Sequence, residues 1–455
     1  MWTPDLDVEG DSLVKRLVNA MAQDIAAGRL KPGAKLPPHR ELAQRMGLGI
    51  GTVTGAYSMA ARRGLIEARV GSGSFVAAPP AAPQDEAMIA LSHNIPPLLP
   101  AERRMAKTLP GLLGRAELLD ALGYVPAAGL PVHRRAAAAW LLRHGRPDGV
   151  DVERLILTTG AQQAMALAFA VLCRPGDTVL VEGATFFGVR TLAQQAGYRM
   201  QGVAMDAEGL LPEALDRAAS GGARVLYTIP TLQNPTGSIM SPDRRRAIAE
   251  VARRRDLWII EDDVYGAFVE GEAPPPLASF APERTFYLSG LSKTVAPGLR
   301  VGFLEAPDAA WFDRLIAAIR AQSYAPPTMG AVIAAQWIED GTADDIVGEI
   351  GGEIAARTAM ARSRLGDRLA PVHSARCPHL WLPMPELDGE RLVARAMRAG
   401  VQLTPASALL CGPADMAGVR LCVGAPRSRD RLETALARLA GILDLPGMDA
   451  AMDLI

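Results

Sequence analysis

The chain has 455 residues, of which 49% are hydrophobic and 21% are charged. This length allows about two or three domains with cores of their own, and the composition excludes a disordered or fibrous protein. No apolar run reaches the roughly 18 residues of a membrane span, the N-terminus holds no apolar signal core, and the four cysteines form no CxxC pair. We therefore expect a cytoplasmic protein without a membrane segment, a bound metal or a disulfide framework.

The N-terminal part is basic, although the net charge of the whole chain is −1. Residues 12–78 contain ten Lys or Arg and three acidic residues, which gives this segment a net charge of +7. A basic module on a nearly neutral body is typical of nucleic-acid binding. A solvated basic surface would carry the same charge, so charge alone does not decide between them.

Three helices and a hairpin are predicted at the N-terminus. Apolar residues recur at a spacing of four within 12–28, and shorter helices are expected over 38–46 and 52–63. Two short strands around a turn follow within 65–76. This order predicts a winged helix-turn-helix, whose third helix enters the major groove of DNA.

Two motifs make this prediction specific. The segment 28–47 matches GxLxPGxxLPxxRxLAxxxG, and the segment 52–76 matches TVxxAYxxxxxxGLIxxxxGxGxFV. Together they resemble the DNA-binding domain of GntR-type regulators, which we assign to residues 11–77. Arginine binds phosphate or guanine, and threonine hydroxyls bind phosphate. We expect contacts to double-stranded DNA from Arg40, Thr52, Thr54, Arg62, Arg63 and Arg69.

One position departs from the GntR pattern. The family usually has a polar residue and then an arginine just before the recognition helix, whereas this sequence has Gly49 and Ile50. Ile50 can touch a thymine methyl but cannot pair with phosphate or guanine. We therefore expect affinity to depend on Arg40, Arg62, Arg63 and the wing. A solvated helix end is the alternative interpretation of Arg62 and Arg63.

A linker separates this module from the rest of the chain. The segment AAPPAAPQDEA is rich in Ala and Pro and predicts a short, semi-extended tether over 78–90. Residues 91–445 then alternate strand-like and helical segments, which predicts an α/β fold with a mostly parallel sheet. The strand candidates are 155–159, 178–183, 224–230, 257–262, 285–290 and 418–423, and helices are expected between them, for example over 161–173 and 242–254.

A lysine follows the strand candidate 285–290, in the segment SKTVAPGLRVG. Ligands gather at the C-terminal ends of such strands, although a lysine in a turn could also be a surface charge. Ser292 and Lys293, followed by Arg300, resemble the cofactor-lysine motif of fold-type I aminotransferases. The resemblance implies pyridoxal phosphate bound to Lys293 as a Schiff base, with Ser292 and Arg300 on its phosphate group.

Two other segments at strand ends match the same family. In EDDVYGAF, the resemblance assigns Asp262 to the pyridinium nitrogen of the cofactor and Tyr265 to its phenolic oxygen. Asp263 is the alternative acid. In QNPTG, Asn234 would share the phenolic oxygen with Tyr265, although a bare NPTG is also a common turn.

A small-residue turn and an aromatic residue complete the expected cofactor site. In TTGAQQA, the backbone N–H groups of Gly160, Ala161 and Gln162 lie at a predicted helix start and would form a phosphate-binding nest. In VEGATFFG, Phe186 matches the aromatic residue that stacks on the cofactor ring. Phe187 is the alternative, and either phenylalanine could belong to the core.

Three more positions bear on the phosphate, the dimer and the ligand. The family often has Ser or Thr three residues before the lysine, where this sequence has Gly290, so the phosphate site would depend on Ser292, Arg300 and the nest. Tyr124 matches a tyrosine that reaches the phosphate of the neighbouring subunit, which implies a homodimer. Arg420 matches the arginine that binds a substrate carboxylate through its bidentate fork.

The two parts together resemble MocR-type (GabR-like) regulators of the GntR superfamily. The resemblance implies a winged helix-turn-helix fused to a fold-type I domain, which consists of a large, mostly parallel sheet domain and a smaller C-terminal α+β subdomain at about 330–445. It implies a DNA-binding transcriptional regulator that senses an amino acid or related amine through external aldimine formation at Lys293. A working aminotransferase with a DNA-binding module, and a regulator whose effector is pyridoxal phosphate itself, are the alternatives.

Overall fold

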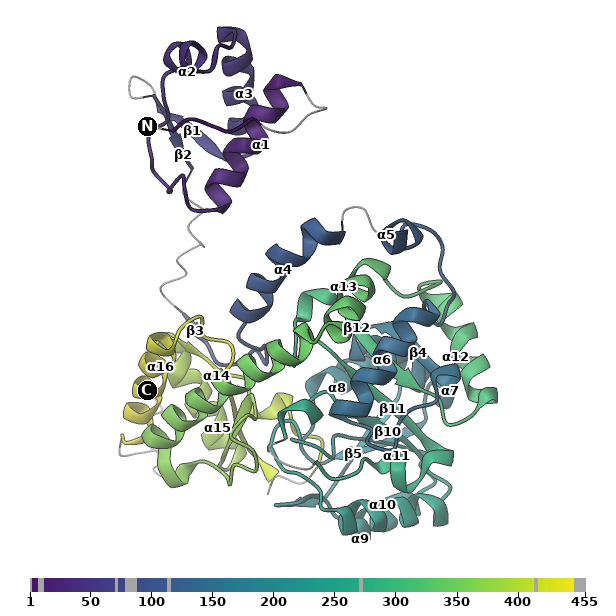
Figure 1. The fold of residues 1–455 in the computed structure, drawn as a ribbon. Coiled ribbons are helices and arrows are strands. Elements are labelled where there is room, and N and C mark those ends of the chain that lie inside the picture. Colours follow the sequence, from purple (N-terminus) through teal and green to yellow (C-terminus); the bar gives the residue numbers. More distant parts are fainter. Residues whose placement is uncertain are drawn as a thin grey trace. The chain divides into compact units, whose positions relative to one another are not determined.

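The computed structural model describes residues 2–6, 12–69, 73–77, 88–112, 116–269, 273–412 and 416–445. The chain divides into two compact units, Met1–Glu86 and Ala87–Ile455, which are described separately (Figure 1). Residues 78–87 of the expected linker and residues 70–72 of the expected wing lie outside the described residues.

The first unit has the expected order of helices and hairpin. Its elements are α1 (Leu13–Ala26), α2 (His39–Met46), α3 (Ile50–Arg62), β1 (Ile66–Arg69) and β2 (Gly73–Val76), and the two strands pair antiparallel. Leu17, Met21, Val53 and Tyr57 are buried between the helices. Gly47 ends α2 at a φ of 64°, a left-handed conformation that glycine adopts without strain. The helix α3 begins at Ile50, two residues before the predicted start.

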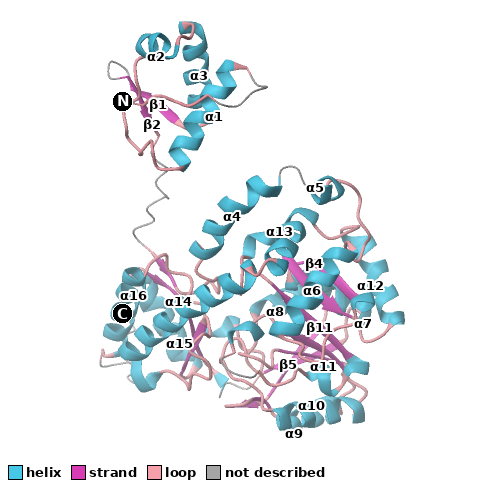
Figure 2. Ribbon diagram, viewed as in Figure 1, coloured by secondary structure: helices cyan, strands magenta, loops and turns pink. Residues whose placement is uncertain are grey.

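A seven-stranded sheet forms the centre of the second unit (Figure 2). The strand order is β4-β12-β11-β10-β9-β5-β6, and all neighbouring pairs are parallel except those that involve β12. The strands are β4 (Leu155–Thr159), β5 (Thr178–Glu182), β6 (Arg199–Val203), β9 (Val225–Thr228), β10 (Trp258–Asp262), β11 (Thr285–Gly290) and β12 (Val301–Glu305). The sheet is therefore mostly parallel, as predicted.

Both faces of this sheet are covered by helices. Alternate residues of β9 belong to different hydrophobic clusters: Val225 and Tyr227 pack into one, and Leu226 into the other. Side chains alternate between the faces of a strand, so a sheet buried on both sides requires apolar residues at successive positions. The surrounding helices are α6 (Pro131–His144), α7 (Ala161–Leu172), α8 (Phe187–Ala196), α9 (Pro212–Ala219), α10 (Pro242–Arg254), α11 (Leu277–Phe280), α12 (Ala309–Gln322) and α13 (Thr328–Glu339).

The remaining elements form a smaller, mixed part of the second unit. They are β3 (Ile89–Ala90), α14 (Thr342–Leu365), β13 (His379–Pro383), α15 (Glu386–Arg398), β14 (Val401–Gln402), β15 (Gly418–Cys422) and α16 (Arg429–Leu443). Two-stranded sheets β13–β15 and β14–β3 lie among these helices. The elements outside both groups are the helices α4 (Leu99–Leu112) and α5 (Ala116–Asp120) and the two-residue strands β7 (Met205–Asp206) and β8 (Gly209–Leu210).

Several boundaries and pairings differ from the expectations. Residues 89–90, assigned to the linker, form β3, because Ile89 is buried and pairs with Val401 of β14. The helix α13, placed by the sequence in the smaller subdomain, packs against α6 of the larger part. The strand candidate 418–423 forms β15, which pairs with β13 outside the central sheet. No described helix is long and apolar enough to cross a membrane.

Candidate functional site

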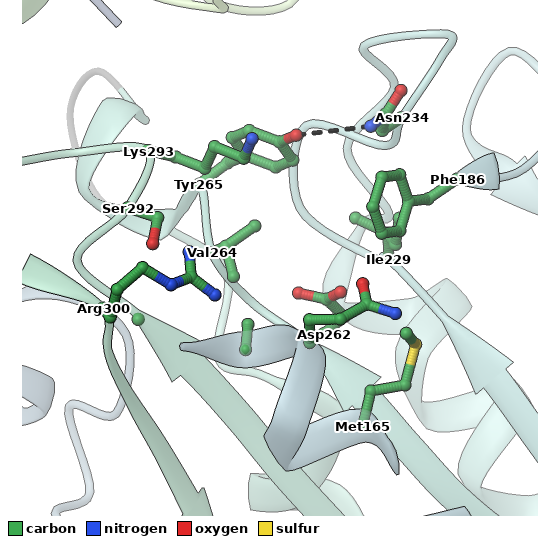
Figure 3. A pocket seen from close by; sticks show the side chains of 13 residues that line it. Met165, Phe186, Ile229, Asn234, Asp262, Val264, Tyr265, Ser292, Lys293 and Arg300 are labelled. Carbon is green, nitrogen blue, oxygen red and sulfur yellow. Dashed lines mark hydrogen bonds between the residues drawn. The ribbon is translucent and has the colours of Figure 1, made fainter. Parts of the chain in front are cut away.

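A cavity of about 190 Å³ lies at the C-terminal ends of the central strands (Figure 3). The strand ends bring side chains from distant parts of the chain together there, as parallel α/β sheets do. The residues that line it are Ala161, Gln162, Met165, Phe186, Ile229, Asn234, Asp262, Val264, Tyr265, Gly290, Ser292, Lys293 and Arg300. Most of the residues that the sequence assigned to a cofactor site therefore share one cavity.

Lys293 follows β11 in a turn and reaches the cavity with its side-chain amine. Its Nζ donates a hydrogen bond to the backbone carbonyl of Asn94 at 2.6 Å. Burial lowers the pKa of Lys293, and the nearby cations Arg420 and Arg300 lower it further. A lower pKa leaves more of the amine neutral, and the neutral amine is the form that attacks an aldehyde carbon.

Asp262 ends β10 and presents one unpaired oxygen. Its Oδ2 accepts a hydrogen bond from the Tyr227 hydroxyl at 2.7 Å, whereas its buried Oδ1 has no partner among the described residues. Burial raises the pKa of Asp262 to about 7. The alternative acid, Asp263, has a similar pattern, with Oδ2 accepting from the hydroxyl of Tyr287 at 2.7 Å and Oδ1 without a partner among the described residues, but it is absent from the cavity lining. Of the two carboxylates, Asp262 is the one available to a cationic ring nitrogen.

Asn234 and Tyr265 meet across the cavity. The Asn234 amide donates to the Tyr265 hydroxyl at 3.3 Å (Figure 3), and burial raises the pKa of Tyr265, which keeps the hydroxyl protonated. The Asn234 Oδ1 accepts a hydrogen bond from Arg420 Nη1 at 2.8 Å. These bonds hold the amide and the hydroxyl in fixed orientations beside Lys293.

The opposite end of the cavity is suited to an anion. Gly160 is the N-cap of α7, and the N–H groups of Ala161 and Gln162 begin that helix, where the helix dipole favours negative charge. Arg300 donates to the Thr159 carbonyl at 3.0 Å and lines the cavity. The buried hydroxyl of Ser292 has no hydrogen-bond partner in the described part of the chain. An unpaired donor beside a helix start and an arginine fits a phosphate group.

Close backbone packing explains the glycine at 290, where the family often has a hydroxyl. Gly290 pairs with Gly302 across β11 and β12. A Cβ on Gly290 would lie 3.0 Å from the Val301 carbonyl oxygen, and a Cβ on Gly302 would lie 2.4 Å from the carbonyl carbon of Gly160. Gly302 is therefore needed for α7 to approach the strands closely, and a side chain at 290 would have to displace the neighbouring backbone of β12.

The two aromatic candidates have different surroundings. Phe186 lines the cavity, whereas Phe187 is 46% exposed and lies against Phe186 with ring centroids 4.9 Å apart. Phe186 is thus the one placed to stack on a planar ligand.

Two expected ligand contacts lie outside the described cavity lining. Tyr124 is 93% exposed and touches only the ring of Tyr324 among the described aromatic contacts, at 5.3 Å. Arg420 is buried behind Asn234, and its Nη2 donates to the Ser92 carbonyl at 2.8 Å. The Nε of Arg420 has no partner among the described residues.

Sequence analysis did not identify Asn94 and His379. The Asn94 side-chain nitrogen lies 2.9 Å from the Tyr265 hydroxyl and 3.1 Å from His379 Nδ1. Neither residue lies in a segment with a motif, and they are far apart in the chain, so only the fold brings them to the site.

The expected DNA-contacting residues lie on the surface of the first unit. Arg40, Thr54, Arg62 and Arg63 are exposed, and Thr52 is half-buried. Ile50, the first residue of α3, is 53% exposed. Arg69 is the remaining expected contact, and its side chain lies outside the described part of the chain.

Two family models match the chain, one for each unit. Residues 86–439 match "Aminotransferase class I and II", and residues 13–76 match "Bacterial regulatory proteins, gntR family". The uncharacterized HTH-type transcriptional regulator YdeF of Bacillus subtilis (strain 168) is 29% identical over 97% of this chain and 97% of its own length. The probable rhizopine catabolism regulatory protein MocR of Rhizobium meliloti is 27% identical over 87% of this chain and 84% of its own length.

A solved structure is similar to the second unit. An archaeal alanine:glyoxylate aminotransferase superposes with a TM-score of 0.72 at 25% identity, over 78% of this chain and 90% of that one. The similarity covers the part of the chain that contains the cavity.

Proposed function

The chain belongs to the class I and II aminotransferase family and carries a gntR-family DNA-binding domain; from this premise, we propose that it is a transcriptional regulator whose second unit senses an amino acid or a related amine. The observation that carries the proposal is the joining of two intact features in one chain: an exposed recognition helix and a cavity with a buried lysine amine. A regulator needs both a DNA contact and a ligand contact.

The cavity fits pyridoxal phosphate, the cofactor that this fold implies. Two buried polar atoms in it, Asp262 Oδ1 and Ser292 Oγ, have no partner among the described residues. They lie at the two ends where the ring nitrogen and the phosphate group would need partners. Lys293 would bind the aldehyde carbon, Tyr265 and Asn234 the phenolic oxygen, and Phe186 the ring face. Gly160, Ala161, Gln162 and Arg300 would hold the phosphate.

When bound, pyridoxal phosphate would supply an electrophilic carbon that reacts with amines and a ring that accepts electrons. Asp262 would hold a proton on the ring nitrogen, because a buried carboxylate is stabilised by an adjacent cation. Lys293 would accept and release protons at its Nζ as the effector amine takes its place. Tyr265 would donate its hydroxyl proton to the phenolic oxygen.

Arg420 is the residue that would bind an effector carboxylate. Its present bonds to Asn234 and to the Ser92 carbonyl hold it behind the cavity. A carboxylate could therefore reach its guanidinium only if the contact with Asn234 opens. The Nε of Arg420 has no partner among the described residues, so it could donate a further hydrogen bond to an effector carboxylate. This opening would be the first local change that the effector causes.

A homodimer would complete the site. Exposed apolar and aromatic side chains are found on and near α5: Leu119 is 71%, Leu122 74% and Tyr124 93% exposed. Large apolar side chains at this exposure support a protein contact. In a dimer, Tyr124 would reach the phosphate of the neighbouring subunit, as its match to the family motif implies.

A shared titration tests the proposed function. The absorbance of the chain loaded with pyridoxal phosphate would be followed against a panel of amines, together with binding to duplex DNA selected from random sequence. We expect one class of amine to change both signals at the same concentration. A spectral change without any change in DNA affinity would contradict regulation by this site.

The second candidate function is transamination. It is favoured by the residues suited to the ring, the phosphate group and the aldehyde carbon of the cofactor, most of which line one cavity. Purified protein with the cofactor, the active amine and a keto acid would decide: sustained formation of a new keto acid would favour the enzyme, and a single turnover without release would favour the sensor. DNA affinity that follows free pyridoxal phosphate without any amine would instead identify the cofactor as the effector.

A further inference from the structure

Asn94 lies where three parts of the second unit meet. It follows β3, the strand next to the expected linker, and is only 9% exposed. Its carbonyl accepts from Lys293 of the larger part, and its side-chain nitrogen lies near Tyr265 of the larger part and His379 of β13. Asn94 therefore contacts the lysine through its backbone carbonyl and the tyrosine through its side-chain amide, whose orientation affects the tyrosine.

The hydrogen bonds of His379 fix its tautomer. Its Nε2 lies 2.9 Å from the Gln233 carbonyl oxygen, which can only accept, so Nε2 carries the proton. Burial lowers the pKa of His379 to about 3, which keeps the ring neutral. Nδ1 is then an acceptor, and it faces the Asn94 side chain at 3.1 Å. Only the NH₂ group of Asn94 can satisfy it, so the amide has one allowed orientation.

This orientation determines which way the Tyr265 hydroxyl donates. The NH₂ group of Asn94 offers its second hydrogen to the Tyr265 oxygen at 2.9 Å, and Asn234 offers another at 3.3 Å. A hydroxyl has one hydrogen and two lone pairs. With both lone pairs occupied by amide donors, the hydroxyl hydrogen of Tyr265 is left to point at a third group, and Tyr265 lines the cavity.

We propose that His379 is a positioning residue: acting through Asn94, it holds Tyr265 as a hydrogen-bond donor to the phenolic oxygen of the cofactor. This inference rests on the proposed function, since it assumes that pyridoxal phosphate occupies the cavity. A hydrogen bond donated to that oxygen stabilises its ionised form. Loss of the donor raises the pH at which the absorbance of the bound cofactor changes and weakens cofactor binding.

The test measures this pH midpoint and the dissociation constant for pyridoxal phosphate in the full-length chain. His379→Leu leaves Asn94 without its acceptor and frees the amide to flip. We expect a two- to tenfold weaker binding of the cofactor and a rise of about 0.3 to 1 pH unit in the midpoint, which is the usual range for one net hydrogen bond. His379→Gln can accept from Asn94 and donate to Gln233, so it should restore most of both values.

A variant of Asn94 tests the same series of hydrogen bonds from His379 to Tyr265. Asn94→Asp has nearly the same shape, but an ionised carboxylate only accepts hydrogen bonds. The Tyr265 hydroxyl would then donate to this carboxylate instead of to the cofactor. We expect a shift at least as large as that of His379→Leu. This variant also carries the test if His379→Leu does not fold. Leu380→Ala removes a buried side chain from the same strand, on its other face, and is the control for simple loss of packing.

A double variant shows whether His379 acts on the cofactor through Tyr265. In a Tyr265→Phe background, which has no hydroxyl to orient, His379→Leu should cause no further shift. An equal shift in that background, or wild-type midpoints in both His379→Leu and Asn94→Asp, would overturn the inference. If the wild-type chain does not take up pyridoxal phosphate at all, both this inference and the proposed function are contradicted. Uptake with identical midpoints in every variant would overturn this inference alone.

Discussion

The amine of Lys293 donates a 2.6 Å hydrogen bond to the carbonyl of Asn94. Asn94 belongs to the segment that leads from the linker into the second unit. Just before it, Ile89 pairs with β14, and the Leu91 carbonyl accepts from the Cys422 backbone N–H at 2.9 Å. The lysine proposed to bind the cofactor is thus in contact with the chain that continues toward the DNA-binding unit.

Replacing Lys293 with alanine removes both the amine and this contact. We expect Lys293→Ala to lose covalent attachment of pyridoxal phosphate and any effector-dependent change in DNA affinity, while DNA binding itself persists. Borohydride reduction followed by mass spectrometry measures the attachment, and fluorescence anisotropy measures the DNA affinity. Lys107→Ala, at an exposed lysine of α4, is the matched control. An effector response that survives in Lys293→Ala would contradict the proposed role.

The raised pKa of Asp262 predicts a pH-dependent stability of the cofactor-free chain. Its pKa is about 7 in the folded chain because the carboxyl is buried, and about 3.9 when unfolded. The folded state therefore binds the proton more tightly. The free energy of unfolding gained from this tighter proton binding is fully present below pH 4 and is lost as the pH rises through 7. It amounts to about 4 kcal/mol at most.

Denaturant unfolding at pH 5 and pH 8 measures this effect. We expect the free energy of unfolding of the wild-type chain to fall relative to that of Asp262→Asn between these pH values, because the amide does not titrate. Parallel pH dependence of the two proteins would show that Asp262 does not have the raised pKa.

A pair of glycine variants separates backbone strain from the phosphate site. Gly160 and Gly149 have φ values of 74° and 80°, which side-chain-bearing residues rarely adopt, so alanine at either is strained and costs about 1–3 kcal/mol of stability. A Cβ at 160 would lie 2.8 Å from Arg300 Nη2, whereas a Cβ at 149 meets no described atom within 4 Å. We expect only Gly160→Ala to weaken binding of pyridoxal phosphate, measured by absorbance titration. Equal losses in both variants would remove Gly160 from the site.

The dependence of DNA binding on salt tests the exposed arginines of the first unit. Arg40→Ala should lower the slope of log affinity against log salt concentration by about 0.9, the value for one phosphate contact. Anisotropy titrations at several salt concentrations measure this slope. Arg29→Ala is the control, since Arg29 is also exposed but forms a 2.6 Å ion pair with Asp24. An unchanged slope for Arg40→Ala would place Arg40 outside the interface.

Charge introduced near α5 should disrupt the proposed dimer. Leu119 and Leu122 are 71% and 74% exposed, and burying a glutamate at these positions in an interface is costly. We expect Leu119→Glu combined with Leu122→Glu to shift the chain from dimer to monomer in light scattering after gel filtration. Leu387→Glu, at a 62% exposed leucine of α15, should leave the dimer intact. A dimer that persists in the double variant would exclude this surface.

Local patterns were sufficient for most elements and for the motif residues of the cavity. Strand β4 and helix α10 have the predicted bounds, because a run of buried residues or an apolar stripe with a Pro at its start is visible within a few residues. Asn234, Asp262 and Lys293 were assigned to the site from motifs that resemble those of the family, and each lies at or after the end of a strand that borders the cavity. In the central sheet, the strands β6 and β12 were missed. They contain glycine, which weakens a strand pattern, and the antiparallel place of β12 depends on its neighbours.

The sequence by itself thus determined the order of elements, the family, and which residues follow the parallel strands. Only the tertiary structure decided that Asp262 rather than Asp263 faces the cavity, that Arg420 lies behind Asn234, and that Asn94 and His379 meet at Tyr265. Periodicity and motifs describe neighbours along the chain. The orientation of a buried side chain depends on the hydrogen bonds offered by segments that are remote in sequence, and these exist only after the core has packed.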